Sequence, residues 1–240
     1  MGDFELINFA DADELARAAA KQWLDQIQAD RQSDRPVTVA ISGGRIAQKF
    51  FAEIVTQAKT SGNSLASVHF FWADERCVPP EDAESNYRLA RELLLAPLAV
   101  AEDRIHRVKG ELSPDDAAAK ACQEVARIAP VNSDGQSVLD WIFLGMGEDG
   151  HVASLFPGEP EEVTASKAAY RAVRNSPKPP PDRVTLGYGA IAAARQVWVL
   201  ISGAGKAGAL RESVKSGGRT PLARVLAARS QTRVFSDILL

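Results

Sequence analysis

The sequence predicts an α/β fold in which a mostly parallel sheet is covered by helices on both faces. Short apolar runs rich in β-branched and aromatic residues recur along the chain, as expected for buried strands. Segments with helical spacing of apolar residues lie between these runs. No break in composition and no long linker divides the 240 residues, so we expect one domain spanning residues 1–240.

Six runs have the composition and length of β-strands. They cover residues 37–41, 68–73, 139–144, 183–187, 196–201 and 232–236. Two other segments, 79–86 and 158–182, look irregular, and the second is rich in proline near its end. We expect this second segment to form a surface loop beside the functional site.

Three segments have the pattern of amphipathic helices. Asp11 can cap the first helix. Its apolar residues recur on one face, at Leu15, Ala19, Trp23 and Ile27. The second helix follows the strand at 37–41 and repeats the four-residue spacing, at Ile46, Phe50 and Ile54. Ser113, a capping residue followed by proline, begins the third.

The composition argues against several classes of function. Lys and Arg total 28 against 31 Asp and Glu, so no overall basic field favours nucleic acid. The two cysteines, Cys77 and Cys122, lack metal-ligand spacing, which argues against a disulfide framework and a zinc site. No run approaches the roughly 18 apolar residues of a membrane span. We therefore expect a cytoplasmic protein without metal, nucleic-acid or membrane partners.

Chemically distinctive residues follow four of the predicted strands. They lie in the stretches 42–45, 74–77, 145–151 and 202–206. Ligands of parallel α/β sheets bind beyond the carboxyl ends of the strands. We therefore expect these stretches to meet at one edge of the sheet.

Two of these stretches are glycine loops before helices. In Ser42-Gly43-Gly44, glycine would let backbone amides approach an anion at a helix start, although a tight turn without ligand fits equally well. Lys206 begins the helix after the other loop, where a cation opposes the helix dipole, and an anionic ligand would explain it. Neither loop matches a P-loop or a dinucleotide fingerprint, so we expect no nucleotide cofactor.

The stretch at 74–77 places three charged residues at a strand end. A solvated turn is one interpretation. In the other, Arg76 binds a phosphate or carboxylate, and Asp74 binds a hydroxyl or transfers a proton.

His151 lies in the glycine-rich stretch LGMGEDGHVASLFPG, residues 144–158. Such a loop can aim an imidazole, and Asp149 can fix its tautomer. A single histidine among scattered carboxylates lacks the ligands of a catalytic zinc site. The chain also lacks the G-x-S-x-G motif of serine hydrolases, which favours a general base acting on water.

Several blocks resemble the 6-phosphogluconolactonases of the pentose phosphate pathway. They are SGG, FFWADERCVPPEDAESNYRLARELLL, GMGEDGHVASLFPG, SPKPPPDRVTLG and SGAGKAGAL, in this order, from about Val37 to Val214. The resemblance implies a three-layer α/β/α sandwich with a Rossmann-like sheet, shared with sugar-phosphate isomerases and deaminases. It also implies hydrolysis of 6-phospho-D-glucono-1,5-lactone, a small-molecule partner. We expect a monomer or a small homo-oligomer.

The resemblance also implies roles for individual residues. His151 is the expected general base, supported by Asp149. The 6-phosphate and the lactone would be held by Ser42, Gly43, Gly44, Arg76, Arg183 and Lys206. Asn86, in the SNYR block, is expected near the site.

One departure from the family concerns the first glycine loop. The family usually reads S-G-G-S-T-P, whereas Arg45-Ile46-Ala47 follow the glycines here. Arg45 either replaces the lost hydroxyl donors with a charged donor or narrows the pocket.

Two other functions remain open. Glucosamine-6-phosphate deaminases are similar around the DGH block but place a glutamate five residues after the histidine, where this chain has Phe156. The missing acid/base group favours lactone hydrolysis. A non-catalytic sugar-phosphate sensor of the same fold is the second alternative, although such sensors normally carry an attached partner module.

Overall fold

A computed structural model describes residues 3–29 and 35–240 of the chain. Its centre is a six-stranded sheet in which every neighbouring pair is parallel. In sheet order, the strands are β1 (Phe4–Asn8), β9 (Thr232–Ser236), β8 (Gln196–Ile201), β5 (Trp141–Gly145), β2 (Val37–Ile41) and β3 (Val68–Trp72). The predicted parallel sheet is therefore confirmed.

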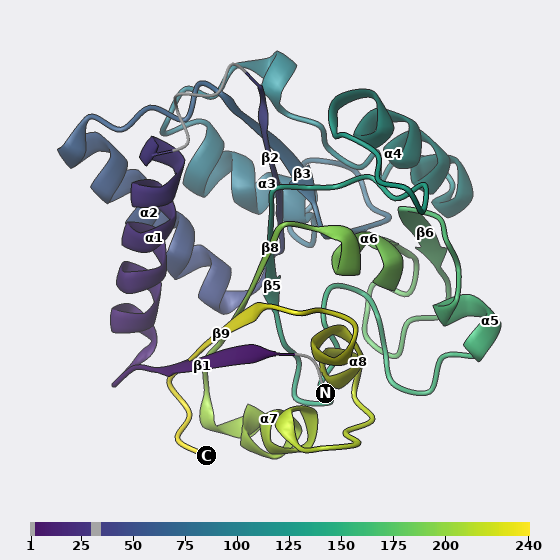
Figure 1. Cartoon of the computed structure of the whole chain (residues 1–240). Coiled ribbons are helices and arrows are strands. Elements are labelled where there is room, and N and C mark those ends of the chain that lie inside the picture. The colour runs from purple at the N-terminus through teal and green to yellow at the C-terminus, as the bar shows by residue number, and fades with distance from the viewer. Residues whose placement is uncertain (1–2, 30–34) are drawn as a thin grey trace.

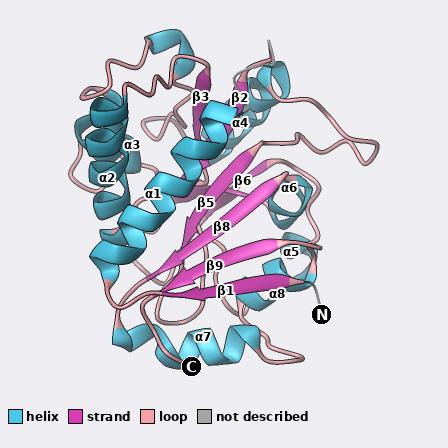
Figure 2. Ribbon diagram, turned by 60° about the vertical axis from the view of Figure 1, so that its left-hand side comes forward, coloured by secondary structure: helices cyan, strands magenta, loops and turns pink. Residues whose placement is uncertain are grey.

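Helices cover both faces of this sheet (Figure 1). One layer contains α1 (Ala12–Ala29) and α2 (Arg45–Ser61), which pack against each other. The opposite layer contains α4 (Pro114–Ile128), α6 (Tyr188–Ala193) and α8 (Pro221–Ala227) (Figures 1 and 2). The other helices are α3 (Asn86–Ala90), η2 (Arg91–Leu95), η3 (Glu102–Arg104), α5 (Glu161–Thr164), η4 (Ala204–Lys206) and α7 (Ala207–Val214). The predicted three-layer sandwich is confirmed.

Aromatic rings fill the core between the sheet and the layer of α1 and α2. Phe143 of β5 lies at the centre of this cluster, with its ring centroid 5.4 Å from that of Trp23 and 4.8 Å from that of Phe50. Trp198 of β8 contacts Phe143 from the side, at 5.7 Å. Full burial of a large apolar side chain contributes about 1.5–3 kcal/mol, so these rings fix α1 and α2 against the strands that carry the site.

A second, three-stranded sheet departs from the sequence prediction. The strand predicted at 183–187 forms as β7 (Arg183–Leu186), but it pairs antiparallel with β4 (Asp74–Arg76) and β6 (Tyr170–Val173), outside the main sheet. The surface loop predicted at 158–182 is partly wrong, because it contains α5 and β6. Tyr170 is buried, and its hydroxyl donates to the carbonyl of Trp72, which anchors β6 to the main sheet.

Arg229, just after α8, ties together the chain between α6 and β8. Its guanidinium is buried, and Nη1 lies 2.7–2.8 Å from the carbonyl oxygens of Ile191, Ala192 and Ala194. These carbonyls lie at the end of a short helix, where no following turn supplies backbone amides to donate hydrogen bonds to them.

Arg229→Met is expected to lower the free energy of unfolding by about 2–3 kcal/mol, because it leaves buried carbonyls without a charged donor. Urea unfolding followed by circular dichroism measures this loss. Arg211→Met, on the exposed side of α7, is the matched control. Equal midpoints for the two variants would show that the guanidinium contributes nothing to stability.

Candidate active site

A cavity of about 150 Å³ opens at the carboxyl edge of the main sheet. The strands β8, β5, β2 and β3 are neighbours in the sheet, so the loops that follow them meet there, as the sequence predicted. Nine of the ten predicted site residues line the cavity: Ser42, Gly43, Gly44, Arg45, Asp74, Arg76, His151, Arg183 and Lys206. The tenth, Asp149, contacts His151.

The His151 imidazole is fixed by the glycine loop that follows β5. Its Nδ1 lies 2.5 Å from Oδ1 of Asp149, and its ring packs against Phe156 with 4.8 Å between centroids. A side chain at Gly147 would place Cβ only 2.1 Å from the imidazole, so only glycine fits there. Because Nδ1 is bound to the carboxylate of Asp149, Nε2 is left as the basic nitrogen of the ring.

Burial and charge have opposite effects on this pair. Burial lowers the pKa of His151 and outweighs the hydrogen bond and charge of Asp149, which act to raise it. Burial acts to raise the pKa of Asp149, but the hydrogen bonds from His151 and the positive charges of His151 and Lys178 together outweigh burial, so the pKa is lowered. Near neutral pH, the pair is therefore a neutral imidazole beside a carboxylate, the form that a general base requires.

One side of the cavity has the features of an anion site. The chain turns into α2 at Gly44, whose φ of +103° favours glycine, and no side chain caps the start of the helix. Arg45 and Lys206 carry positive charge beside this helix start. Burial lowers the pKa of Lys206, and the Arg45 cation lowers it further. An anion bound here would relieve both effects.

The second sheet supplies two more arginines to the cavity. Arg76 of β4 lies directly opposite Arg183 of β7 in the antiparallel pairing. Asp74, two residues before Arg76, is buried, and its Oδ2 accepts a hydrogen bond from Ser154 at 2.6 Å. Asp74–Arg76 therefore forms a strand rather than the solvated turn that was one interpretation of this stretch, and the strand register places the two arginines side by side.

Two polar atoms of the cavity residues are buried and have no hydrogen-bond partner within the described chain. They are Oγ of Ser42 and Nε of Arg76. Buried polar groups are normally paired, and an unpaired one is costly. Both residues line the cavity, so a polar ligand could supply the missing partners.

Arg183 is largely engaged by the protein itself. Its Nε donates to the carbonyl of Pro180 at 3.0 Å, and Nη2 donates to the carbonyls of Lys178 and Pro179 at 3.0 and 2.9 Å. Its Nη1 lies 3.4 Å from the hydroxyl of Ser154. Four of its five N–H groups are thus in use, so its main contacts are to the loop before β7.

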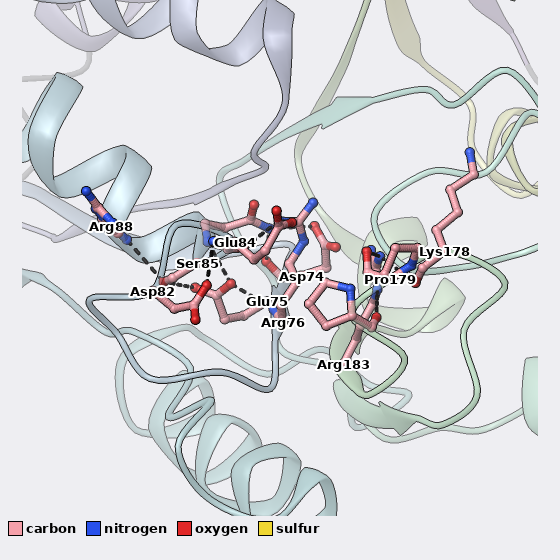
Figure 3. Close-up of polar contacts among 12 residues, drawn as sticks. Asp74, Glu75, Arg76, Asp82, Glu84, Ser85, Arg88, Lys178, Pro179 and Arg183 are labelled. Atoms are coloured by element: carbon pink, nitrogen blue, oxygen red, sulfur yellow. Dashed lines mark hydrogen bonds and ion pairs between the residues drawn. The ribbon is translucent and has the colours of Figure 1, made fainter.

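The sequence analysis missed Glu75, which organises the loop between β4 and α3. Its carboxylate is buried and accepts hydrogen bonds at 2.7 Å from the backbone amides of Arg76, Asn86 and Tyr87. Figure 3 shows Glu75 with Arg76 and Ser85. The hydroxyl of Ser85 donates a fourth, at 3.2 Å. Burial raises the pKa of Glu75 to about 7, against these hydrogen bonds. In the sequence, Glu75 stands between two other charged residues and shortly before an irregular segment. Nothing in that pattern indicates that its carboxylate binds backbone amides.

Asn86 depends on that carboxylate for its place in the cavity. Its Nδ2 donates to the carbonyl of Asp74 at 2.9 Å, and its Oδ1 occupies the space beside Gly43, where a Cβ would come within 2.0 Å of it. The expectation that Asn86 lies near the site is confirmed, because it lines the cavity.

Glu75→Gln is expected to lower the free energy of unfolding by about 1–3 kcal/mol, because an amide nitrogen cannot accept the hydrogen bonds of Tyr87 and Ser85. Displacement of Arg76 and Asn86 should also lower kcat/KM for the cognate substrate, by about 10–100-fold. Thermal unfolding and steady-state kinetics measure the two effects. Glu81→Gln, an exposed change in the same loop, is the control, and an equal response of both variants would contradict this role.

The described residues contain no group of three or more His, Cys, Asp or Glu placed to hold a metal ion. The two histidines other than His151 lie outside the cavity and contact each other, with Nδ1 of His69 2.8 Å from Nε2 of His106. Within the described ranges, no helix is both long and apolar enough to cross a bilayer.

Comparison with known proteins supports the resemblance found in the sequence. A family model described as glucosamine-6-phosphate isomerases/6-phosphogluconolactonase matches residues 10–235. The 6-phosphogluconolactonase of Mycobacterium tuberculosis is 35% identical over 218 residues, which cover 89% of this chain and 86% of that protein. That of Streptomyces coelicolor is 32% identical over 237 residues, which cover 96% and 90% of the two chains.

Solved structures agree with this result. The 6-phosphogluconolactonase from Trypanosoma brucei has a TM-score of 0.83 at 26% identity, covering 98% of this chain and 96% of that one. A monomeric glucosamine-6-phosphate deaminase has a TM-score of 0.78 at 19% identity, which shows the shared fold alone. On the family match and the identity to its relatives, the chain belongs to the glucosamine-6-phosphate isomerase/6-phosphogluconolactonase family.

Proposed function

We propose that this protein hydrolyses 6-phospho-D-glucono-1,5-lactone to 6-phosphogluconate in the oxidative pentose phosphate pathway. The observation that carries the proposal is the His151–Asp149 pair at the edge of a cavity lined by four cationic side chains. The relatives named 6-phosphogluconolactonase support this choice of substrate. We also propose that residues 1–240 act as one cytoplasmic lactonase domain, as a monomer or small homo-oligomer.

In the proposed reaction, His151 is a general base and then a general acid. Its Nε2 takes a proton from water while the water oxygen attacks the lactone carbonyl. Arg76 or the backbone amides of Gly43 and Gly44 can stabilise the resulting oxyanion. The intermediate then collapses, the bond from the carbonyl carbon to the ring oxygen breaks, and His151 returns its proton to that oxygen. One water is consumed, and the product is a carboxylic acid.

The phosphate of the substrate is proposed to lie at the start of α2. The uncapped helix N-terminus favours an anion, and Arg45 and Lys206 add positive charge there. In this arrangement, Arg45 supplies a charged donor in place of the hydroxyls found in related loops. The opposite side of the cavity, with Arg76 and His151, then receives the lactone ring.

Phe156 argues against a deaminase. Its ring is buried and packs against the imidazole of His151. The guanidinium carbon of Arg183 lies over the same ring, 5.6 Å from the ring centroid of Phe156. A deaminase of this family would need an acid/base group at that position. Release of ammonia from glucosamine 6-phosphate would identify the deaminase activity, and turnover-free binding would identify a sensor.

His151→Ala is expected to lower kcat by about 10²–10⁴-fold, because it removes the general base. Lactone generated in situ from glucose 6-phosphate by a dehydrogenase, with formation of 6-phosphogluconate followed against the spontaneous reaction, measures this loss. Binding of 6-phosphogluconate to the variant, measured by calorimetry, should persist because the phosphate contacts remain. Turnover near that of the wild type would remove His151 from the mechanism.

Lys206→Ala is expected to raise KM by about tenfold to a hundredfold with a smaller change in kcat, because a charged contact to the phosphate is lost at a distance from the reacting carbon. The same assay over a range of lactone concentrations separates KM from kcat. Lys120→Ala, an exposed change on α4, is the matched control. A wild-type KM in Lys206→Ala would contradict the phosphate site.

A further inference from the structure

Lys178 lies beside the His151–Asp149 pair without lining the cavity. Its ammonium is 3.4 Å from Nδ1 of His151 and 3.6 Å from Oδ1 of Asp149. The side chain is 43% exposed, and it comes from the segment between β6 and β7. This segment was predicted as a surface loop beside the site, and no role was expected for its lysine.

Arg183 determines where Lys178 lies. The guanidinium donates to the carbonyl oxygens of Lys178, Pro179 and Pro180, three consecutive residues of this turn (Figure 3). Ser176 closes the turn from the other side, because its hydroxyl donates to the carbonyl of Lys178 and accepts from its amide. In Figure 3, the side chain of Lys178 extends away from Arg183. Its ammonium lies beside His151 and Asp149, at the distances given above.

The interaction between Lys178 and His151 is electrostatic and is not a hydrogen bond. Nδ1 of His151 already shares its proton with Asp149, so it has no lone pair to accept from the ammonium. Among charged groups, the carboxylates of Asp149 and Asp74 and the ammonium of Lys178 have the main effects on the imidazole, which also shares the cavity with Arg45, Arg76, Arg183 and Lys206. A proton taken up at Nε2 would create an imidazolium within 4 Å of another cation, and charges at that separation repel.

We propose that Lys178 is a positioning residue of this reaction: its ammonium shares Asp149 with His151 and disfavours the imidazolium. His151 then remains the free base in the resting enzyme and returns its proton readily to the ring oxygen. The inference rests on the proposed lactonase function for its kinetic consequence, but not for the charge coupling itself. Burial has the largest effect on the pKa of His151 and lowers it, Asp149 comes next and raises it, and Lys178 follows and lowers it.

The first test measures protonation of His151 without substrate. The chain has three histidines, so imidazole NMR signals can be resolved, and the signal absent in His151→Ala is that of His151. Lys178→Met should shift its titration midpoint to higher pH, whereas Lys178→Arg should keep the wild-type midpoint. Lys120→Met, with the same loss of charge on exposed α4, should leave it unchanged.

The second test uses the pH dependence of kcat/KM. Since His151 must be unprotonated, kcat/KM falls as pH falls through its pKa, and a higher pKa moves this fall to higher pH. The activity of Lys178→Met relative to wild type should therefore decline as pH decreases, to about one-tenth in the acid range. The ratio cancels the second ionisation of the substrate phosphate, near pH 6.

The outcomes separate the two proposals. An unchanged His151 midpoint in Lys178→Met, or a raised KM with a flat activity ratio, overturns the role of Lys178 while leaving the lactonase function intact. A shifted midpoint in a protein without lactonase activity overturns the proposed function and retains the charge coupling. Recovery of both midpoint and pH profile in Lys178→Arg supports the inference, because a purely structural role would not follow charge.

Discussion

The site depends on the parallel pairing of four buried strands. Because β8, β5, β2 and β3 run in the same direction and lie next to one another, the chain leaves each at the same edge. Ser42, Asp74 and Gly145 follow or end three of these strands, and each lines the cavity. A one-residue slip in any pairing would turn its side chains to the opposite face and bury the wrong set against the helices. Core packing and site geometry are therefore fixed by the same register.

The parts of the fold that follow from local pattern were predictable. The strand at Val37–Ile41 and the helix at Arg45–Ser61 are set by buried β-branched residues and by four-residue apolar spacing, which act within a short stretch. The edge strand Phe4–Asn8 was missed because it is only partly buried and its polar residues Glu5 and Asn8 leave no continuous apolar run. The second sheet was missed because β4 is three residues long and exists through its pairing with distant β7.

The residues of the site also divide into those that a local sequence pattern indicates and those that depend on the tertiary fold. Glycines beside His151 signalled a constrained loop, and the structure supplies the reason, since a Cβ at Gly147 would overlap the imidazole. Glu75 and Lys178 gave no such signal, because each acts through backbone or charge contacts that the tertiary fold creates. Arg183 was expected from the family resemblance, but not its contacts to the loop before β7. An arginine in a family block suggests a ligand contact, yet the carbonyls before β7 occupy most of the donors of Arg183. Only the three-dimensional pairing distinguishes these uses of one side chain.

The distribution of charge also bears on product release in the proposed reaction. The phosphate end of the cavity is cationic, with Arg45 and Lys206 beside an uncapped helix start. The end that holds His151 also contains the carboxylates of Asp74 and Asp149. The lactone is uncharged at its carbonyl, but hydrolysis converts that group into a carboxylate, which these two acids repel and the Arg76 guanidinium attracts. The phosphate contacts are the same before and after the reaction, so the balance of this repulsion and this attraction sets how tightly the product is held relative to the substrate. In the proposed reaction, the phosphate contacts therefore hold substrate and product alike, and the charges at the reacting end act on the group that changes.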